Sequence, residues 1–323
     1  MIGPVQIRNY KSIRDLKFDA RRVNLFIGEP NTGKSNVIEA LSFFAEGAFT
    51  HFKDIFRFQN VADLFFDQKV ANEIFVAIGD WEFSLVFRGT IYSGSLIQVV
   101  GPGTKIPKLT VNLHHDGVVG VPGVAGTSVR FYRFASLENF PSRQPGALNP
   151  PFGDNLVAVL YSNEELRQRI GAIIRAKGFR LQLKPTENEL LITKDVNDEL
   201  YSYPWKSVSE TIRRVVFLMA VLETNQNMTL LLDEPEANTF PFYTKYLAER
   251  IALDETNQFF ITTHNPYLLS SIVEKTPKDK LAVFVTRMEN FETKVKQVPE
   301  KNLPELLELD SDAFFNLDRL VAE

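Results

Sequence analysis

Residues 28–35 read GEPNTGKS, which is the spacing G-x-x-x-x-G-K-[ST] of a Walker A phosphate-binding loop. Gly28 and Gly33 allow the tight turn that brings successive backbone N–H groups within reach of phosphates. Lys34 directs its charge at the β- and γ-phosphates, and the Ser35 hydroxyl is placed to ligate Mg²⁺. The residues predicted to bind nucleotide in this loop are Gly28, Asn31, Thr32, Gly33, Lys34, Ser35 and Asn36. The stretch predicts that the chain binds a nucleoside triphosphate.

The sequence on either side of the loop fits this interpretation. VNLFI at residues 23–27 is an apolar run typical of a buried parallel strand, and residues 36–46 carry Val37, Ile38 and Leu41 at helical spacing. A strand, a glycine loop and a helix N-terminus together make an anion site from backbone dipoles. A chance match on an ordinary strand–turn–helix is the alternative. The agreement of the context favours the phosphate site.

Composition excludes several classes of protein. The 323 residues contain no cysteine, so disulfides and cysteine-based metal sites or nucleophiles are excluded. With 44% hydrophobic residues, the chain can bury a sizeable core. No apolar stretch reaches the length of a membrane span and no leader pattern opens the chain, so we expect a cytoplasmic protein without a membrane segment. The formal net charge of −4 argues against a globally basic nucleic-acid coat.

A second motif lies in the second half of the chain. Residues 230–232 are three leucines followed by Asp233 and Glu234, the pattern of a Walker B strand. At the carboxyl end of such a strand, Asp233 would hold the Mg²⁺ shell and Glu234 would polarise the attacking water. An ordinary strand that ends in acidic turn residues is the alternative. The Walker A loop upstream favours the catalytic interpretation.

A third apolar strand is predicted at residues 258–262 (QFFIT), and His264 follows it closely. A histidine at this end of a core strand could donate to the γ-phosphate or to the attacking water. The alternative is a structural histidine whose ring only makes local hydrogen bonds at the end of a strand. We predict His264 as a catalytic residue together with Lys34 and Glu234.

The motifs GEPNTGKS, LLLDEPEA and ITTHNPYLL, in this order, resemble the ABC-type ATPase heads of the RecF/SMC-like and OLD-like AAA ATPase families, and IRNYKSIRDLKFD near the N-terminus is similar to their opening strand. The resemblance implies Lys34 and Ser35 on the phosphates and Mg²⁺, Asp233 on the metal, Glu234 as the base and His264 as the switch histidine. It also places the nucleotide base near Lys11 and Ser12. We expect a stand-alone head without a coiled-coil arm or TOPRIM nuclease.

The expected fold class is α/β. The chain is interpreted as one ATPase head over residues 1–323, with a P-loop NTPase core, an antiparallel β subdomain and a helical segment that bears the signature motif. Alternating apolar residues between Gly and Asp turns predict the β subdomain. The expected ranges are 1–60 and 207–290 for the core, 72–135 for the β subdomain and 150–206 for a helical and β insertion.

The signature motif of such heads departs from the usual pattern. The best candidate is KSVSETIRR at residues 206–214, where Ser207 or Ser209 would contact the γ-phosphate of the opposite subunit from a helix N-terminus. The usual glycines are missing. Ser207 with Glu210 also fits a simple helix capping box. The Q-loop residue is unassigned, with Gln59 and Gln68 as candidates.

These observations lead to two leading hypotheses. In the first, two heads dimerise around ATP and Mg²⁺, hydrolyse the ATP and control a separate effector protein, in DNA repair or phage defence. In the second, the head is an ATP-gated binding module with little intrinsic hydrolysis. A transporter ATPase is weaker because the signature glycines and a clear Q-loop are lacking, and a GTPase lacks its [NT]-K-x-D motif. The basic residues between 167 and 184 form either a solvated face or a nucleic-acid contact.

Overall fold

A computed structural model describes residues 1–101, 103–118 and 126–321. A six-stranded sheet in the order β15-β14-β3-β13-β12-β8 carries both nucleotide motifs. Its strands are β3 (Val23–Gly28), β8 (Val129–Tyr132), β12 (Thr229–Asp233), β13 (Gln258–Thr262), β14 (Leu281–Glu289) and β15 (Glu292–Gln297). All neighbours pair in parallel except β14 and β15, which form an antiparallel hairpin. The carboxyl ends of β3, β12 and β13 therefore meet at one edge.

A second six-stranded sheet is antiparallel, in the order β2-β1-β4-β5-β6-β7. Its strands are β1 (Pro4–Tyr10), β2 (Ile13–Asp19), β4 (Ile74–Ile78), β5 (Trp81–Phe87), β6 (Tyr92–Val99) and β7 (Lys105–Leu113). The strands β4 to β7 follow the alternation in the sequence, and they confirm the expected antiparallel sheet. The register across β6 and β7 shifts between Leu96 and Ile97.

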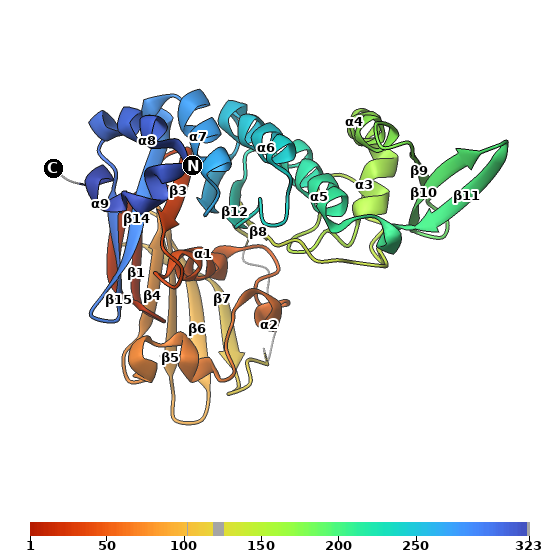
Figure 1. The fold of residues 1–323 in the computed structure, drawn as a ribbon. Coiled ribbons are helices and arrows are strands. Elements are labelled where there is room, and N and C mark those ends of the chain that lie inside the picture. The colour runs from red at the N-terminus through yellow and green to blue at the C-terminus, as the bar shows by residue number, and fades with distance from the viewer. Residues whose placement is uncertain (102, 119–125, 322–323) are drawn as a thin grey trace.

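Helix α1 (Lys34–Leu41) lies between the two sheets, while α5 (Glu210–Thr224), α6 (Pro241–Leu253) and α7 (Pro266–Lys275) cover the other face of the parallel sheet (Figure 1). The other α-helices in the described part of the chain are α2 (Phe52–Ile55), α3 (Leu156–Ser162), α4 (Glu164–Arg175), α8 (Leu303–Leu309) and α9 (Leu317–Leu320). Helix α1 is shorter than the range 36–46 expected from the sequence. A 3₁₀ turn, Ser42–Phe44, replaces its last part.

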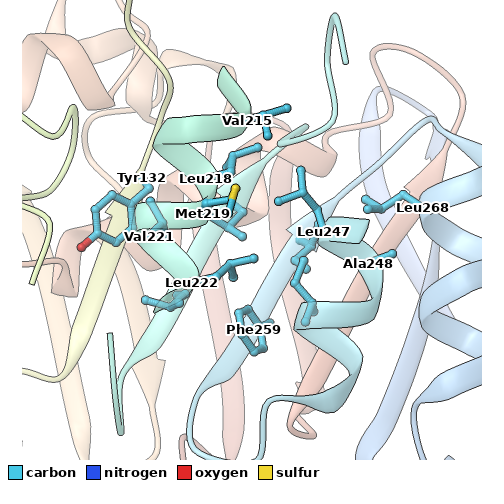
Figure 2. Packing of buried hydrophobic residues seen from close by; sticks show 14 of the residues in the cluster. Tyr132, Val215, Leu218, Met219, Val221, Leu222, Leu247, Ala248, Phe259 and Leu268 are labelled. Carbon is cyan, nitrogen blue, oxygen red and sulfur yellow. The ribbon is translucent and has the colours of Figure 1, made fainter. Parts of the chain in front are cut away.

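The strands of the parallel sheet are buried on both faces, as their unbroken apolar runs predict. In β12, Leu230 and Leu232 face the helices α5 to α7, and Leu231 faces α1 and the antiparallel sheet. On the helical side, Leu218 and Leu222 of α5 gather with Phe259 of β13 and other side chains of the same cluster (Figure 2). This double burial leaves the sheet's edges and ends as the places where polar side chains can emerge.

Helices α3 and α4 lead into a three-stranded antiparallel sheet of β9 (Arg180–Lys184), β10 (Glu189–Val196) and β11 (Glu199–Pro204). This region projects away from the two large sheets (Figure 1). Every residue of β11 is exposed.

The observed sheets differ from the expected ranges in three places. Strand β8 lies within the range 72–135 but pairs in parallel with β12, so it belongs to the core sheet. Strands β1 and β2 lie within the range 1–60 but belong to the antiparallel sheet. Strand β15 extends the core sheet beyond residue 290. The pairs β8–β12 and β1–β4 join strands far apart in the sequence, and local alternation carries no information about such partners. Strand β15 pairs with the preceding strand β14 and joins the core sheet because β14 pairs with β3.

Candidate functional site

The phosphate loop joins the end of β3 to the start of α1. Gly33 has a φ of +93° and is the N-cap of α1. A Cβ on Gly33 would lie 2.0 Å from Thr293 Oγ1, and one on Gly28 would lie 2.4 Å from the carbonyl oxygen of Thr286. Both threonines belong to the β14–β15 hairpin, which packs against the loop. The glycines are therefore required by a left-handed turn and by close approach of the hairpin.

Thr32 is turned away from the nucleotide side and holds the loop. Its hydroxyl donates to the carbonyl oxygen of Glu29 at 2.8 Å and lies 2.7 Å from Thr286 Oγ1. Its own carbonyl oxygen accepts from Thr293 Oγ1 at 3.0 Å. The Thr32 backbone N–H thus remains the group through which this residue would contact a phosphate.

The ammonium group of Lys34 folds back onto the loop. Nζ donates to the carbonyl oxygens of Gly28 at 2.9 Å and Glu29 at 2.7 Å. Burial lowers the pKa of Lys34 to about 8, although the nearby carboxylates of Glu234 and Asp233 favour its charged form. The Lys34 ammonium group has lost part of its hydration through burial, and a bound phosphate group would compensate for that loss.

Ser35 and Asp233 form the candidate Mg²⁺ site. Ser35 Oγ donates to Asp233 Oδ1 at 2.8 Å, and Thr262 Oγ1 donates to the same oxygen at 2.6 Å. A hydroxyl and a carboxylate oxygen suit Mg²⁺, which usually takes few protein ligands and fills its shell with phosphate oxygens and water. No group of three or more His, Cys, Asp or Glu within the described ranges could hold a metal alone. The donor set therefore fits a Mg²⁺ that arrives with a nucleotide.

Glu234 and His264 meet next to this pair. His264 Nε2 lies 3.0 Å from Glu234 Oε1. Glu234 has a φ of +46°, and its backbone N–H donates to Thr262 Oγ1 at 3.0 Å. A non-glycine residue in this region is strained, and such residues gather at functional sites. Burial and the charge of Lys34 lower the pKa of His264, although the carboxylates of Glu234 and Asp233 oppose this, so the ring is neutral at pH 7.

A cavity of about 370 Å³ connects these groups. Five predicted nucleotide-binding residues line it, namely Asn31, Gly33, Lys34, Ser35 and Asn36, together with Glu234 and His264. Ser12 lines it too, whereas Lys11 is not among the lining residues and its Nζ donates to Glu39. The structure thus brings the Walker A loop, Glu234 and His264 to one cavity, and Asp233 is hydrogen-bonded to Ser35 of its lining.

Besides Pro30 of the loop itself, sequence reasoning missed the lining residues Arg57 and Met288. Arg57 Nε donates to Glu39, whose side chain is only 1% exposed and also accepts from Tyr10 and Lys11. The buried carboxylate holds the guanidinium at the rim of the cavity. Arg57 follows the short helix α2 and Met288 is the penultimate residue of β14, and neither position carries a local motif. Their placement depends on long-range packing.

The candidate signature serines lie elsewhere. Ser207 and Ser209 line a separate cavity of about 520 Å³ that is largely apolar and shares no lining residue with the phosphate cavity. The capping box of Ser207 and Glu210 is wrong, because α5 begins at Glu210 and its N-cap is Ser209. The Ser209 hydroxyl makes no capping hydrogen bond. It is therefore available for another acceptor.

Neither Q-loop candidate lines the phosphate cavity. Gln68 Nε2 donates to Asp63 Oδ1 at 2.9 Å, and Gln59 donates its backbone N–H to Asp63 Oδ2 at 3.0 Å. Both residues serve the turn around Asp63. The structure gives no support to either candidate.

Ion pairs and carbonyl contacts engage part of the basic stretch between 167 and 184. Arg169 pairs with Glu165 at 2.5 Å and with Glu223 at 3.1 Å. Lys184 pairs with Glu187 at 2.9 Å, and Arg167 donates to the carbonyl oxygens of residues 160 and 161. These contacts favour the solvated face over a nucleic-acid contact.

Two family models match the chain. One is described as an AAA ATPase domain and matches residues 1–87. The other is described as an AAA domain, putative AbiEii toxin, Type IV TA system, and matches residues 129–270. The first match contains the Walker A loop, and the second contains Asp233, Glu234 and His264. No curated protein matches the chain.

Among the solved structures that are similar to this chain are two SMC heads. One is a SmcHead bound to the C-winged helix domain of ScpA, with 13% sequence identity and a TM-score of 0.54, which covers 94% of this chain and 99% of that one. The other is an SMC head domain from Thermotoga maritima, with 13% identity and a TM-score of 0.42, covering 92% of this chain and 99% of that one. The first likeness shows that the fold is that of an SMC head.

The two family matches and this fold identify the chain as an ABC/SMC-like AAA ATPase head with a P-loop NTPase fold. Its class is thus that of ATP-binding and ATP-hydrolysing modules. None of the helices in the described part of the chain has the length and apolar character that crossing a bilayer requires.

Proposed function

We propose that this head is a cytoplasmic, Mg²⁺-dependent ATPase that acts as a switch: two copies close around ATP, hydrolyse it and reopen. The observation that carries the proposal is that Lys34, Ser35 and the Glu234–His264 pair line one cavity, while Asp233 accepts a hydrogen bond from Ser35. Bound Mg²⁺ would neutralise phosphate charge in this cavity. In this proposal Lys34 is the cation that binds phosphate, and Ser35 and Asp233 are the oxygen ligands of Mg²⁺. Glu234 is the base and His264 is the hydrogen-bond donor.

Glu234 is proposed as the general base. Its carboxylate lies 3.0 Å from His264 Nε2 and lines the cavity beside the phosphate loop, where a water molecule could approach the γ-phosphate. When nucleotide is bound, the ring N–H of His264 would donate to the water or to the γ-phosphate in place of Glu234 and so orient it. Lys34 would hold the transferred phosphate group in position.

A second copy of the chain is proposed to complete the site. Ser207 and Ser209 line a cavity that shares no residue with the phosphate cavity of their own chain. The free Ser209 hydroxyl and the N-terminus of α5 would instead offer hydrogen-bond donors to the γ-phosphate held by the other copy. ATP would therefore join the two heads.

The switch is proposed to act on a separate effector protein. The similar SmcHead is bound to a domain of another protein, ScpA, which supports a role in partner control. The description of one matching family names a putative toxin of a Type IV TA system, and this favours defence over DNA repair as the setting. The paired basic residues of α4 give little support to a nucleic-acid partner.

A second candidate is an ATP-gated binding module with little intrinsic hydrolysis. The observation in its favour is the lack of glycine in residues 206–214, which removes the backbone flexibility of the usual signature turn. In this case ATP would clamp the dimer, and the partner would trigger hydrolysis.

The test is light-scattering mass and phosphate release for the wild type and Glu234→Gln, each with and without Mg·ATP. An ATP-dependent dimer in both, with phosphate release in the wild type alone, is expected for the hydrolytic switch. Dimerisation without release in either protein would favour the binding module. A mass that does not change with nucleotide, together with absent release, would overturn the switch.

A further inference from the structure

Glu236 is a buried carboxylate to which the proposed function gives no role. It follows the Walker B acids by two residues and is only 6% exposed. Leu218 and Leu222 of α5, Leu247 of α6 and Leu268 of α7 line the same small cavity as Glu236. A carboxyl group among such side chains loses hydration and gains little from packing. An apolar residue would suit this position better if stability were the only requirement.

The contacts of Glu236 all lead to the segment that carries His264. Glu236 Oε1 accepts from Thr263 Oγ1 at 2.5 Å and from the backbone N–H of His264 at 3.3 Å. Thr263 Oγ1 in turn accepts from the backbone N–H of Asn265 at 3.0 Å. One carboxylate oxygen thus fixes three successive residues after β13. Glu236 Oε2 has no hydrogen-bond partner among the described residues.

This link crosses from one catalytic element to another. Glu236 lies in the turn after β12, which carries Asp233 and Glu234, and His264 lies in the turn after β13. Pairing between β12 and β13 ends at Asp233 and Thr262, so the ladder does not hold the backbone of His264. The hydrogen bond to Glu236 is the one that the structure assigns to the His264 N–H.

We propose that Glu236 is a positioning residue for His264: it ties the histidine turn to the Walker B turn, and so holds the imidazole against Glu234. The proposal rests on the proposed function, because the position of His264 matters only if the ring acts at the γ-phosphate. His264 Nε2 lies 3.0 Å from Glu234 Oε1 in the resulting arrangement. A catalytic group misplaced by about 1 Å loses on the order of a hundredfold in rate.

The role requires an acceptor oxygen at this position and does not require a charge. Burial raises the pKa of Glu236 to about 7, so the protonated and ionised forms are both populated near neutrality. The glutamine amide offers the same oxygen and the same shape. Glu236→Gln therefore retains the acceptor, whereas Glu236→Leu replaces the carboxyl group with an apolar side chain of similar size.

The kinetic test compares these two variants in the full chain. Glu236→Leu is expected to lower kcat by about ten- to a hundredfold while KM for Mg·ATP stays within about threefold, and Glu236→Gln is expected to stay near the wild type. In a His264→Ala background, Glu236→Leu should cause no further loss, because both changes act on one group. A further loss in that background, or a Glu236→Leu protein as active as the wild type, would overturn the proposal.

A second readout does not depend on turnover. The chain has four histidines, so His264 can be identified in ¹H–¹³C spectra by its loss in His264→Ala. Glu236→Leu should shift or broaden the His264 signal and leave those of His51, His114 and His115 in place. Thr263→Val removes the hydroxyl between Glu236 and Asn265 and should shift the same His264 signal. This second variant tests the proposal even if Glu236→Leu fails to fold. An unmoved His264 signal in a folded variant would overturn the proposal.

The two readouts separate this inference from the proposed function. If the wild type hydrolyses no ATP but the His264 signal moves as expected, the hydrolytic switch fails and the positioning contact stands. If the wild type hydrolyses ATP and neither the rate nor the signal responds to Glu236→Leu, only the positioning role fails.

Discussion

The phosphate cavity and the signature segment differ in how completely one chain builds them. Around the cavity, side chains from the start of α1 and from the ends of β12 and β13 already contact one another, as in the Ser35–Asp233 and Glu234–His264 pairs. At the signature segment, the Ser209 hydroxyl makes no capping hydrogen bond and faces a different cavity. The comparison teaches that folding of one chain gathers the residues proposed to bind the nucleotide, whereas it leaves the signature candidates Ser207 and Ser209 at a separate cavity.

The largest effect is expected at the proposed base. Glu234→Gln should lower ATP turnover by about a thousandfold because the amide cannot take a proton from water, while nucleotide binding is retained. Phosphate release and titration with a fluorescent ATP analogue measure the two properties. Glu255→Gln, at an exposed position, is the matched control. If Glu234→Gln turned over ATP as fast as the wild type, Glu234 would not be the catalytic base of the phosphate cavity.

The next largest effect is the pH dependence of the free energy of unfolding, which we expect from Glu236 in the turn after β12. The folded-state pKa of Glu236 is about 7, above its ordinary value of 4.5, so the folded chain binds this proton more tightly than the unfolded chain. Its stabilising contribution is complete below pH 4.5 and is lost as the pH rises through 7. Relative to Glu236→Gln, the wild type should lose about 3 kcal/mol of unfolding free energy over this range.

Chemical denaturation of both proteins at several pH values checks this expectation. If the difference between the wild type and Glu236→Gln did not change with pH over this window, the Glu236 carboxyl group would be ionised in the folded state throughout.

A smaller effect is expected at the phosphate loop. Lys34→Ala should weaken Mg·ATP binding by about fifty- to a hundredfold, because a charge-assisted contact with the phosphates is lost. Calorimetric titration measures the affinity, and Lys53→Ala, which removes an exposed lysine of α2, is the control. Unchanged affinity would mean that nucleotide does not occupy this cavity as proposed.

The smallest effect is expected at the signature segment and tests the other half of the comparison. Ser209→Ala should lower turnover by about tenfold and leave ATP binding to the single head within about twofold, since the hydroxyl would act only in the dimer. Ser202→Ala, in exposed β11, is the control. A weaker binding constant in Ser209→Ala would mean instead that the segment reaches the nucleotide of its own chain.

Much of the fold and site could be predicted from local sequence. The Walker A spacing, the leucines before Asp233 and the strand before His264 each occupy a few consecutive residues, and they predicted the parts that the structure brings to one cavity. The alternation of apolar residues also predicted the strands β4 to β7. By contrast, Arg57 and Met288 reach the cavity through contacts with residues far away in the sequence, and no spacing indicates such contacts.

Strand β8 shows the same limit for the fold. Its sequence, VRFY, is as compatible with the antiparallel sheet as with the parallel one, and only pairing with β12, about a hundred residues later, decides between them. The LLLDEPEA stretch contains Glu236, but the second acid of EPE looks like a solvated turn residue until its burial is known.

The sequence by itself determined the chemistry of the phosphate loop, the acid pair and the histidine, because glycine geometry, charge and hydrogen-bonding capacity belong to the residues themselves. Only the tertiary structure decided that Thr293 and Thr286 press against the loop, that Glu39 holds Arg57, that Glu236 is buried beneath α5 to α7, and that Ser209 lies outside the phosphate cavity. These features depend on which distant segments pack together, and that choice minimises the free energy of the whole chain rather than of any local stretch.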